Sequence, residues 1–207
     1  MCGRFSLGMT ITQAQQLFPF MIRDLKDLSS WQPQFNIAPG SDVLTLVGRS
    51  DQVWGGLVRW GWPAPWNTSQ VIINARIESL GEKPSFRNAR RALVLADSFY
   101  EWHQQSKQPY RILPSNQPLF PIAAIVQTTA TEPAHRVILV TKAADESTKN
   151  IHPRVPLILT PKAASLWLAG DRPLASEKTI RLNAIPISHD VNNARTNSKD
   201  LHRPMSV

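Results

Sequence analysis

The chain has 207 residues, 42% of them hydrophobic, and its 23 Lys and Arg against 15 Asp and Glu give a net charge of +8. This length favours one domain over residues 1–207, with a frayed polar tail at 196–207. No apolar run approaches the ~18 residues that cross a bilayer, and polar residues interrupt the first segment, so neither a membrane protein nor a secretory leader is expected.

The basic charge favours a polyanionic partner, and nucleic acid is the commonest one. We therefore expect a cytoplasmic protein, associated with the nucleoid if it binds DNA. A single cysteine excludes an intramolecular disulfide. The five histidines show no metal-ligand spacing and no Gly-rich phosphate loop occurs, so no metal and no cofactor are expected.

The single cysteine, Cys2, directly follows the initiator Met. Aminopeptidases remove Met1 before a small residue, which leaves Cys2 with an α-amine beside its thiol. Their unperturbed pKa values, about 7.7–8.0 and about 8.5, keep part of both groups unprotonated near neutral pH. Such an aminothiol condenses with an aldehyde to an imine, which the sulfur closes to a thiazolidine. We interpret Cys2 as a nucleophile, and a small buried hydrophobe is the alternative.

Apolar spacing predicts a first helix over 11–18 with Thr12 as its N-cap, followed by a hairpin of strands 42–48 and 52–60. Short helices are expected at 84–91 and 143–150. A further helix should begin at Pro161 and stop at Gly170. The other expected strands are 71–73, 92–96, 109–113, 119–126, 136–141, 157–159 and 183–187.

Trp54, Trp60, Trp62 and Trp66 lie within thirteen residues. Two prolines, at 63 and 65, predict a loop without regular structure after Trp62. Tryptophans on a surface loop of a basic protein are typical of platforms that stack bases, each worth about 1–3 kcal/mol. We expect Trp54 and Trp60 in the core. For Trp62 and Trp66, base stacking and packing onto the core remain equal alternatives.

Three polar residues flank predicted core strands. Asn74 directly follows 71–73, where a side chain is well placed to enter a site. Glu101 lies between aromatic residues, and an apolar setting raises a carboxyl pKa and suits it to acid/base work; an exposed Glu is the alternative. His152 precedes 157–159 and is either a general acid/base or a capping residue.

These stretches, taken in order, resemble the SRAP family of SOS-response-associated peptidases, or abasic-site-processing proteins. The resemblance covers nearly the whole chain, and its ordered set of motifs is specific although each motif alone is weak. The matching segments are Met1–Phe5, Phe35–Pro39, Arg59–Gly61, Asn74–Arg76 with Glu78, Phe99–Trp102, Gln108–Tyr110, Ile151–Arg154 and Val191–Asn192.

The resemblance implies an α+β fold: a single domain with a β-rich, barrel-like mixed sheet core and short flanking helices. It implies a monomer that binds single-stranded DNA at abasic sites and crosslinks to the sugar aldehyde through Cys2 as a thiazolidine. Asn74 would orient the amine or the sugar, Glu101 would act as acid/base, and His152 would assist ring opening and reversal. The implied DNA-binding residues are Arg4, Asn36, Pro39, Trp62, Trp66, Arg76 and Arg154.

The sequence departs from the family pattern in three places. Pro153 stands where the family has Asp after the His, which changes how His152 is oriented. Ser98 replaces the Gly before Phe-Tyr-Glu-Trp. The usual Trp-Gly-Leu-Ile-Pro reads Trp60-Gly61-Trp62-Pro63, which affects contacts between this loop and DNA.

Three other functions compete with the crosslinker. A cysteine peptidase or autoprotease would use Cys2, His152 and Glu101 to release Met1, and a lyase activity is a further possibility. A glutamine amidotransferase with an N-terminal nucleophile is disfavoured because the chain has no Asn-Gly pair. A non-covalent single-strand binder would leave Cys2 purely structural.

Overall fold

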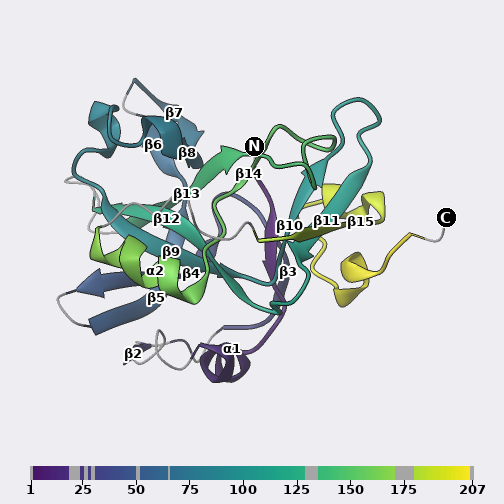
Figure 1. The fold of residues 1–207 in the computed structure, drawn as a ribbon, viewed down its shortest axis with the longest axis horizontal. Helices are drawn as coiled ribbons and strands as arrows, with labels where there is room; N and C mark the ends of the chain where they lie inside the picture. The colour runs from purple at the N-terminus through teal and green to yellow at the C-terminus, as the bar shows by residue number, and fades with distance from the viewer. Residues whose placement is uncertain are drawn as a thin grey trace.

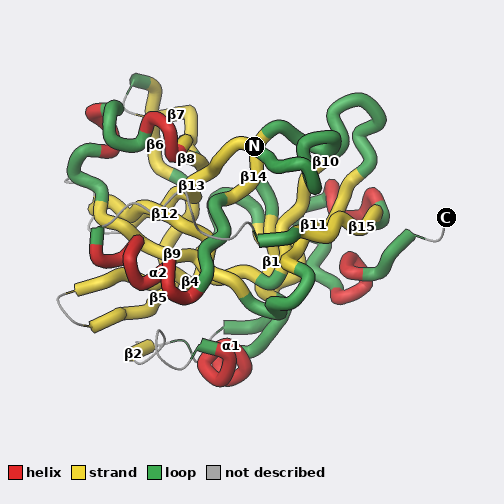
Figure 2. Tube along the Cα trace, in the orientation of Figure 1, coloured by secondary structure: helices red, strands yellow, loops and turns green. Residues whose placement is uncertain are grey.

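The computed structural model describes residues 2–18, 24–25, 28, 31–49, 52–64, 66–128, 135–170 and 180–205. Strands make up most of its regular secondary structure, and two α-helices, α1 (Ile11–Leu17) and α2 (Pro161–Ala169), lie outside the sheets (Figure 2). The strands are β1 (Phe5–Leu7), β2 (Asp24–Leu25), β3 (Gln34–Ile37), β4 (Asp42–Arg49), β5 (Gln52–Trp60), β6 (Trp62–Ala64), β7 (Asn67–Ile72), β8 (Asn74–Arg76), β9 (Arg90–Ala96), β10 (Ser98–Trp102), β11 (Pro109–Pro114), β12 (Phe120–Thr128), β13 (His135–Ala143), β14 (Arg154–Pro156) and β15 (Leu182–Pro186).

Five strands close into a ring. β4 pairs with β5 and β9, β9 pairs with β12, and β12 pairs with β13, all antiparallel. The parallel pairing of β13 with β5, at Val137 opposite Trp60, completes the ring. Beyond it, β8 and β14 extend the far half of β13. The expected α+β fold with a barrel-like mixed sheet is therefore confirmed (Figure 1).

A second sheet, in the order β15-β11-β10-β1-β3, lies beside the barrel (Figure 1). β1 pairs antiparallel with β10, Phe5 opposite Phe99 and Ser6 opposite Ser98. Because side chains alternate between the faces of a strand, β1 sends Phe5 into the core and turns Ser6 away from it. The first described residues therefore lie between the two sheets.

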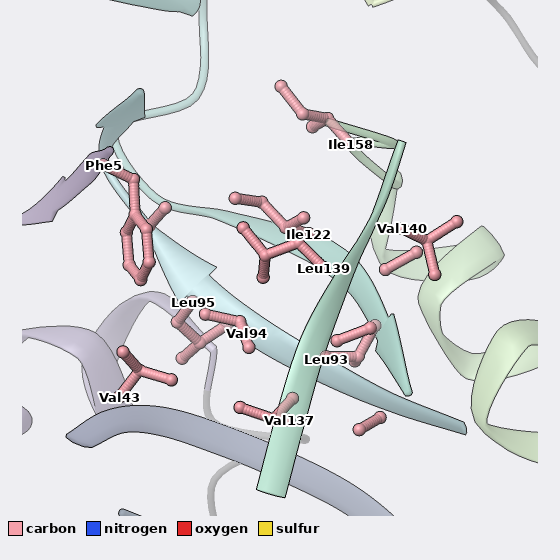
Figure 3. Packing of buried hydrophobic residues seen from close by; sticks show 14 of the residues in the cluster. Phe5, Val43, Leu93, Val94, Leu95, Ile122, Val137, Leu139, Val140 and Ile158 are labelled. Carbon is pink, nitrogen blue, oxygen red and sulfur yellow. The ribbon is translucent and has the colours of Figure 1, made fainter. Parts of the chain in front are cut away.

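The core fills the barrel and the space between its outer wall and α2. Figure 3 shows Val94, Ile122 and Leu139 together in the barrel with Phe5 beside them, while Val140 faces α2. The fully buried Trp167 of α2 donates its indole N–H to the carbonyls of Ala92 (2.9 Å) and Ala124 (3.2 Å). Apolar burial and this bond fix α2 across β9 and β12.

Several local expectations hold. The hairpin of β4 and β5 and the strands at 92–96, 109–113, 119–126, 136–141 and 183–187 all form, within a few residues of the expected ends. α2 begins at Pro161 and ends at Gly170, whose φ of 103° is the left-handed conformation that glycine adopts freely.

Other expectations need correction. The N-cap of α1 is Thr10, not Thr12: its hydroxyl accepts from the Gln13 backbone, and the Gln13 side chain accepts from the Thr10 N–H in a capping box. The segment after Trp62 is not an irregular loop but strand β6, paired with β7, with Pro63 opposite Val71. A proline fits here because a two-stranded ribbon has open outer edges.

The short helices expected at 84–91 and 143–150 are absent from those described residues. Pro84–Phe86 is a single 3-10 turn and β9 already begins at Arg90, while 143–150 forms turns. The strand expected at 157–159 lies earlier, at β14, and leaves one isolated bridge between Ile158 and Ile122. At Arg90 and Arg91, pairing with β12 outweighs the weak local helix preference.

The tail from 196 on does not fray in residues 196–205. Lys199–His202 forms a 3-10 turn, Leu201 is 3% exposed, and the Met205 N–H donates to the carbonyl of Pro186 at 2.9 Å. Burial of Leu201 and these bonds tie the tail to the second sheet. No helix within the described residues is long and apolar enough to cross a membrane.

Candidate active site

Cys2 lies where β1 runs up against β10 and β8. Its side chain is fully buried, and its thiol points to the carbonyl of Arg4 with Sγ···O 3.7 Å. The backbone bond from Tyr100 N–H to Arg4 O (2.9 Å) continues the pairing of β1 with β10 toward this end, which brings Gly3 opposite Glu101. Burial, and secondarily the charge of Glu101, raise the pKa of the Cys2 thiol, so the thiol is uncharged here.

Asn74 holds the backbone of Cys2. It is the first residue of β8, which runs parallel to β13 with Asn74 opposite Leu139. Its amide nitrogen, Nδ2, donates to the Cys2 carbonyl at 2.8 Å. Its Oδ1 is buried and accepts no hydrogen bond from any described residue. Buried polar atoms are normally paired, so an unused acceptor beside Cys2 is available to a substrate.

Glu101 and His152 form the other half of the site. Glu101 is 3% exposed, its Oε1 has no hydrogen-bond partner within the described chain, and Oε1 lies 3.8 Å from His152 Nδ1. Burial raises the pKa of Glu101 to about 7, as the flanking aromatics predicted. Burial lowers the pKa of His152, so the imidazole is neutral near pH 7. A carboxyl that titrates near neutrality suits proton transfer.

The orientation of His152 comes from the backbone of Arg154. The Arg154 N–H and carbonyl both lie within hydrogen-bond distance of His152 Nδ1, at 3.1 and 2.9 Å. The Arg154 guanidinium in turn donates to both carboxylate oxygens of Glu78 (2.7 and 2.9 Å) and to the carbonyl of Thr141 (2.7 Å). This turn spans Pro153, so the ring is held without a carboxylate at position 153.

Glu78 is the site residue that sequence reasoning left without a role. The Arg154 guanidinium lowers the pKa of Glu78, chiefly through its hydrogen bonds. A bidentate Arg–carboxylate pair is geometrically specific, so Glu78 fixes Arg154 and with it the turn that carries His152. The only available signal was the position of Glu78, four residues after Asn74 and two residues after the end of the Asn-Ala-Arg segment.

A hollow of about 890 Å³ opens beside Asn74. Three of the expected DNA-binding residues line it, namely Trp66, Arg76 and Arg154, together with Lys83. Trp66 is 69% exposed, so its ring is available for stacking. The structure thus brings Asn74, an exposed indole and several cationic side chains into one concave surface.

Trp62 does not share this exposure. It is 4% exposed and packs edge-on against Phe86, with ring centroids 5.7 Å apart. Trp60, at 1% exposed, lies in the core as expected. Of the two tryptophans left open between base stacking and core packing, Trp66 lies at the surface and Trp62 lies inside.

Arg4, Asn36 and Pro39 do not line the hollow. One Arg4 guanidinium nitrogen donates to Asn36 Oδ1 and to the Val191 carbonyl, both at 2.7 Å, and burial lowers the pKa of Arg4. Asn36 is 5% exposed and donates to backbone carbonyls of the 191–196 segment. Pro39 lies exposed on a separate turn. Arg4 and Asn36 therefore anchor the N-terminal segment to the C-terminal one.

Fold and site together define a β-barrel protein with a buried cysteine beside a basic hollow. The family model described as SOS response associated peptidase (SRAP) matches residues 1–194, and the chain belongs to this family. The chain is 34% identical over 181 residues to the abasic site processing protein YoqW of Bacillus subtilis, covering 81% of this chain and 80% of that protein.

It is also 30% identical to the abasic site processing protein YedK of Escherichia coli, over 99% of this chain and 100% of that protein. A crystal structure of a Bacteroides thetaiotaomicron protein superposes with a TM-score of 0.78 at 20% identity, covering 99% of this chain and 100% of that one. This last likeness concerns the fold. The described residues contain no group of three or more His, Cys, Asp or Glu side chains placed to hold a metal ion.

Proposed function

We propose that this protein captures abasic sites in single-stranded DNA by forming a thiazolidine between Cys2, freed of Met1, and the sugar aldehyde. One observation carries the proposal: Asn74, Glu101 and His152, from three distant stretches, converge on residue 2. Asn74 reaches the Cys2 carbonyl at 2.8 Å, and Glu101 lies 3.8 Å from His152. The relatives named abasic site processing proteins support the choice of substrate.

The hollow supplies the binding surface for the strand. Arg76 and Lys83 are suited to phosphate oxygens, and the exposed Trp66 ring is suited to stack on a base. Arg154 is already paired with Glu78, so it contributes to DNA binding by forming part of the rim of the hollow. Because Asn74 both lines the hollow and bonds Cys2, a sugar bound there lies next to residue 2.

The chemistry runs in three balanced steps. Neutral His152 takes the proton of the C1′ hydroxyl and passes it to the ring oxygen as the bond between C1′ and that oxygen breaks, and the furanose opens to its aldehyde. The Cys2 amine then adds to C1′ and one of its protons moves to the former carbonyl oxygen. Protonated Glu101 gives its proton to the resulting hydroxyl, so that water leaves and a protonated imine remains beside the Glu101 carboxylate. Finally the Cys2 sulfur adds to C1′, and its proton goes to the Glu101 carboxylate. The net reaction is aminothiol plus aldehyde to thiazolidine plus water.

A carboxyl with a pKa of about 7 fits the second step because it is present in both forms near neutral pH. The neutral state of His152 fits the first step, which needs a base. Because burial raises the pKa of the Cys2 thiol, the sulfur enters the proposed third step as a thiol, and its proton must be accepted nearby. The carboxylate that Glu101 becomes in the second step is that acceptor.

Intact-mass spectrometry tests the proposal directly. Protein lacking Met1 is mixed with a single-stranded oligonucleotide that carries one abasic site, and a heat-stable adduct of protein plus DNA minus one water is expected. The intact strand is the control. Absence of any adduct with processed protein would end the proposal.

The Cys2→Ala variant separates the amine from the sulfur. It retains an N-terminal amine, so we expect no heat-stable adduct but an imine that borohydride traps. A heat-stable, unreduced adduct with Cys2→Ala would show that another residue forms the bond. Equal affinity for intact and abasic strands without an adduct would favour a non-covalent binder instead.

The autoprotease remains the second candidate, because His152 and Glu101 lie within 3.8 Å of each other beside Cys2. It predicts that Glu101→Gln retains Met1 in cells that lack the usual aminopeptidase, whereas wild-type protein loses it. Intact mass distinguishes the two outcomes. Normal loss of Met1 in the variant counts against self-cleavage and leaves the crosslinking proposal unaffected.

A further inference from the structure

The barrel has a second opening, at the end away from Cys2. A cavity of about 420 Å³ lies there, lined by β4, β5, β9, β12 and the start of β13. His135 at the start of β13 lines this cavity, whereas Thr141 near its end pairs with Arg76 of β8. Six residues of strand separate the two positions by about 20 Å. In Figure 1 the β4–β5 hairpin at this end points away from β14.

Gly56 leaves the lumen unfilled at this end. The sheet register places Gly56 opposite Thr45, and Thr45 opposite Val94, so all three positions face the inside of the barrel. A Cβ added at Gly56 would meet no atom within 4 Å. Glycine within a strand costs about 0.5–1 kcal/mol relative to alanine and often marks the close approach of a ligand.

The walls and the rim of this cavity differ in chemistry. Its walls are mainly apolar, with Val47, Trp54, Val58 and Val126, and they include the uncharged polar residues Thr45 and Asn88. Arg90 and His135 lie at the rim, and the guanidinium of Arg90 is held by its bond to the Gly48 carbonyl at 2.8 Å. No acidic side chain is among the described residues that line the cavity. A concave apolar site with a few polar groups at one side is typical of small-molecule pockets.

We propose that this cavity is a binding site for a small aromatic anion, such as an aromatic carboxylate of one or two rings. The ring lies against Trp54 and the flat backbone at Gly56, and the carboxylate lies toward the Arg90 guanidinium. The indole face and the glycine floor explain the preference for a flat ring, and the cationic rim explains the preference for negative charge. The proposal does not depend on the chemistry at Cys2.

Calorimetric titration with 2-naphthoate and its neutral analogue 2-naphthylmethanol tests this site on the full chain. We expect saturable binding of one naphthoate per protein and roughly tenfold weaker binding of the alcohol, because the charge-assisted hydrogen bond to Arg90 is lost. Equal affinities for the two probes would overturn the assignment of an anion. Absence of saturable binding by either would overturn the site.

Two variants locate the binding. Gly56→Val fills the open space and should abolish binding of both probes, whereas Val53→Ala, on the outward face of the same strand and outside the cavity lining, should leave binding unchanged. Arg90→Gln should remove the roughly tenfold difference between the probes. Unchanged naphthoate binding by Gly56→Val would place the ligand elsewhere and refute the proposal. The thermal midpoint of each variant confirms folding, and adduct formation with abasic DNA is expected to be unaffected by Gly56→Val.

Discussion

Two buried polar clusters lie beside the paired strands β1 and β10. They differ in how completely their polar atoms are hydrogen-bonded. The Cys2 site, formed by Cys2, Asn74, Glu101 and His152, contains two buried oxygens without a hydrogen bond, Asn74 Oδ1 and Glu101 Oε1. The Ser6 network lies on the other side of β1 and consists of Ser6, Asp97, Ser98, Arg111 and His202. No polar side-chain atom of that network is buried without a partner.

The contacts of the Ser6 network show this completeness. Asp97 accepts from the hydroxyls of Ser6 and Ser98 and, at 2.6 Å, from the Gly8 N–H. Arg111 donates to Ser98 Oγ at 2.9 Å, and His202 Nε2 lies 3.2 Å from Ser6 Oγ. A satisfied buried network stabilises a fold, whereas unsatisfied atoms cost stability and mark a site that waits for a ligand. The Ser6 network is therefore structural, whereas the unpaired oxygens of the Cys2 site are what a site for chemistry requires.

The largest expected effect is on the crosslinking rate of Glu101→Gln. Loss of a positioned acid/base should slow adduct formation about 10²–10⁴-fold, measured by single-turnover gel shift with an abasic oligonucleotide. Binding to the intact strand serves as the control and should not change. A rate within twofold of wild type would remove Glu101 from the mechanism.

Asp97→Ala should lower the free energy of unfolding by about 3–5 kcal/mol, because the hydroxyls of Ser6 and Ser98 and the Gly8 N–H lose their acceptor. Urea denaturation measures the change. Asp97→Asn retains part of the network and should lose less. If Asp97→Ala were as stable as wild type, the contrast between a structural and a chemical cluster would fail.

Glu101→Gln should also change stability, in the direction opposite to Asp97→Ala. The folded-state pKa of Glu101 is raised to about 7, so its stabilising contribution is complete below the ordinary carboxyl pKa and is lost as the pH rises through 7. The variant should therefore become more stable than wild type above pH 7, by about 3 kcal/mol. Urea denaturation at pH 4.5 and pH 8 checks this; no gain at pH 8 contradicts it.

Trp66→Ala should weaken binding to single-stranded DNA by about 1–3 kcal/mol without a loss of stability, since the ring is 69% exposed. Fluorescence anisotropy with an intact strand measures the affinity. Trp62→Ala is the matched comparison, because its ring is buried and its truncation should cost about 3–5 kcal/mol of stability. Equal affinities for Trp66→Ala and wild type would remove the stacking role.

The smallest expected effect belongs to Glu78→Gln. Losing the carboxylate charge weakens the clamp on Arg154 and loosens the turn that orients His152, so the crosslinking rate should fall roughly tenfold. The pH–rate profile should shift as well, because the environment of His152 changes. An unaltered profile with an unaltered rate would leave Glu78 as a surface partner of Arg154 only.

Local features were predictable from the sequence because their causes are local. Pro161 and Gly170 bound α2, and alternating apolar residues around Ser50 and Asp51 specify the β4–β5 hairpin. The aromatic residues on either side of Glu101 predicted that its carboxyl pKa is raised. Local patterns also singled out Cys2, Asn74, Glu101 and His152 as candidates, whereas the barrel-like core and the specific roles of these four residues came from the family resemblance.

The remainder depends on contacts between distant residues. Ring closure rests on the parallel pairing of β5 and β13, which no local pattern reveals. Trp62 is buried because Phe86, on a turn far along the chain, packs on it. The clamp of Glu78 on Arg154 joins residues 76 positions apart. Such pairings are decided by the whole fold, so periodicity and propensity do not report them.

The hydrogen bond from the Arg4 guanidinium to the Val191 carbonyl has a consequence for the order of events during synthesis. Val191, which accepts the hydrogen bond from Arg4, emerges from the ribosome near the end of synthesis, while residue 1 emerges first. At about 5–20 residues per second, the nascent N-terminus stays open to an aminopeptidase for many seconds before the pocket closes over it. On the proposed function, removal of Met1 therefore belongs to translation, because the finished fold buries Cys2 completely.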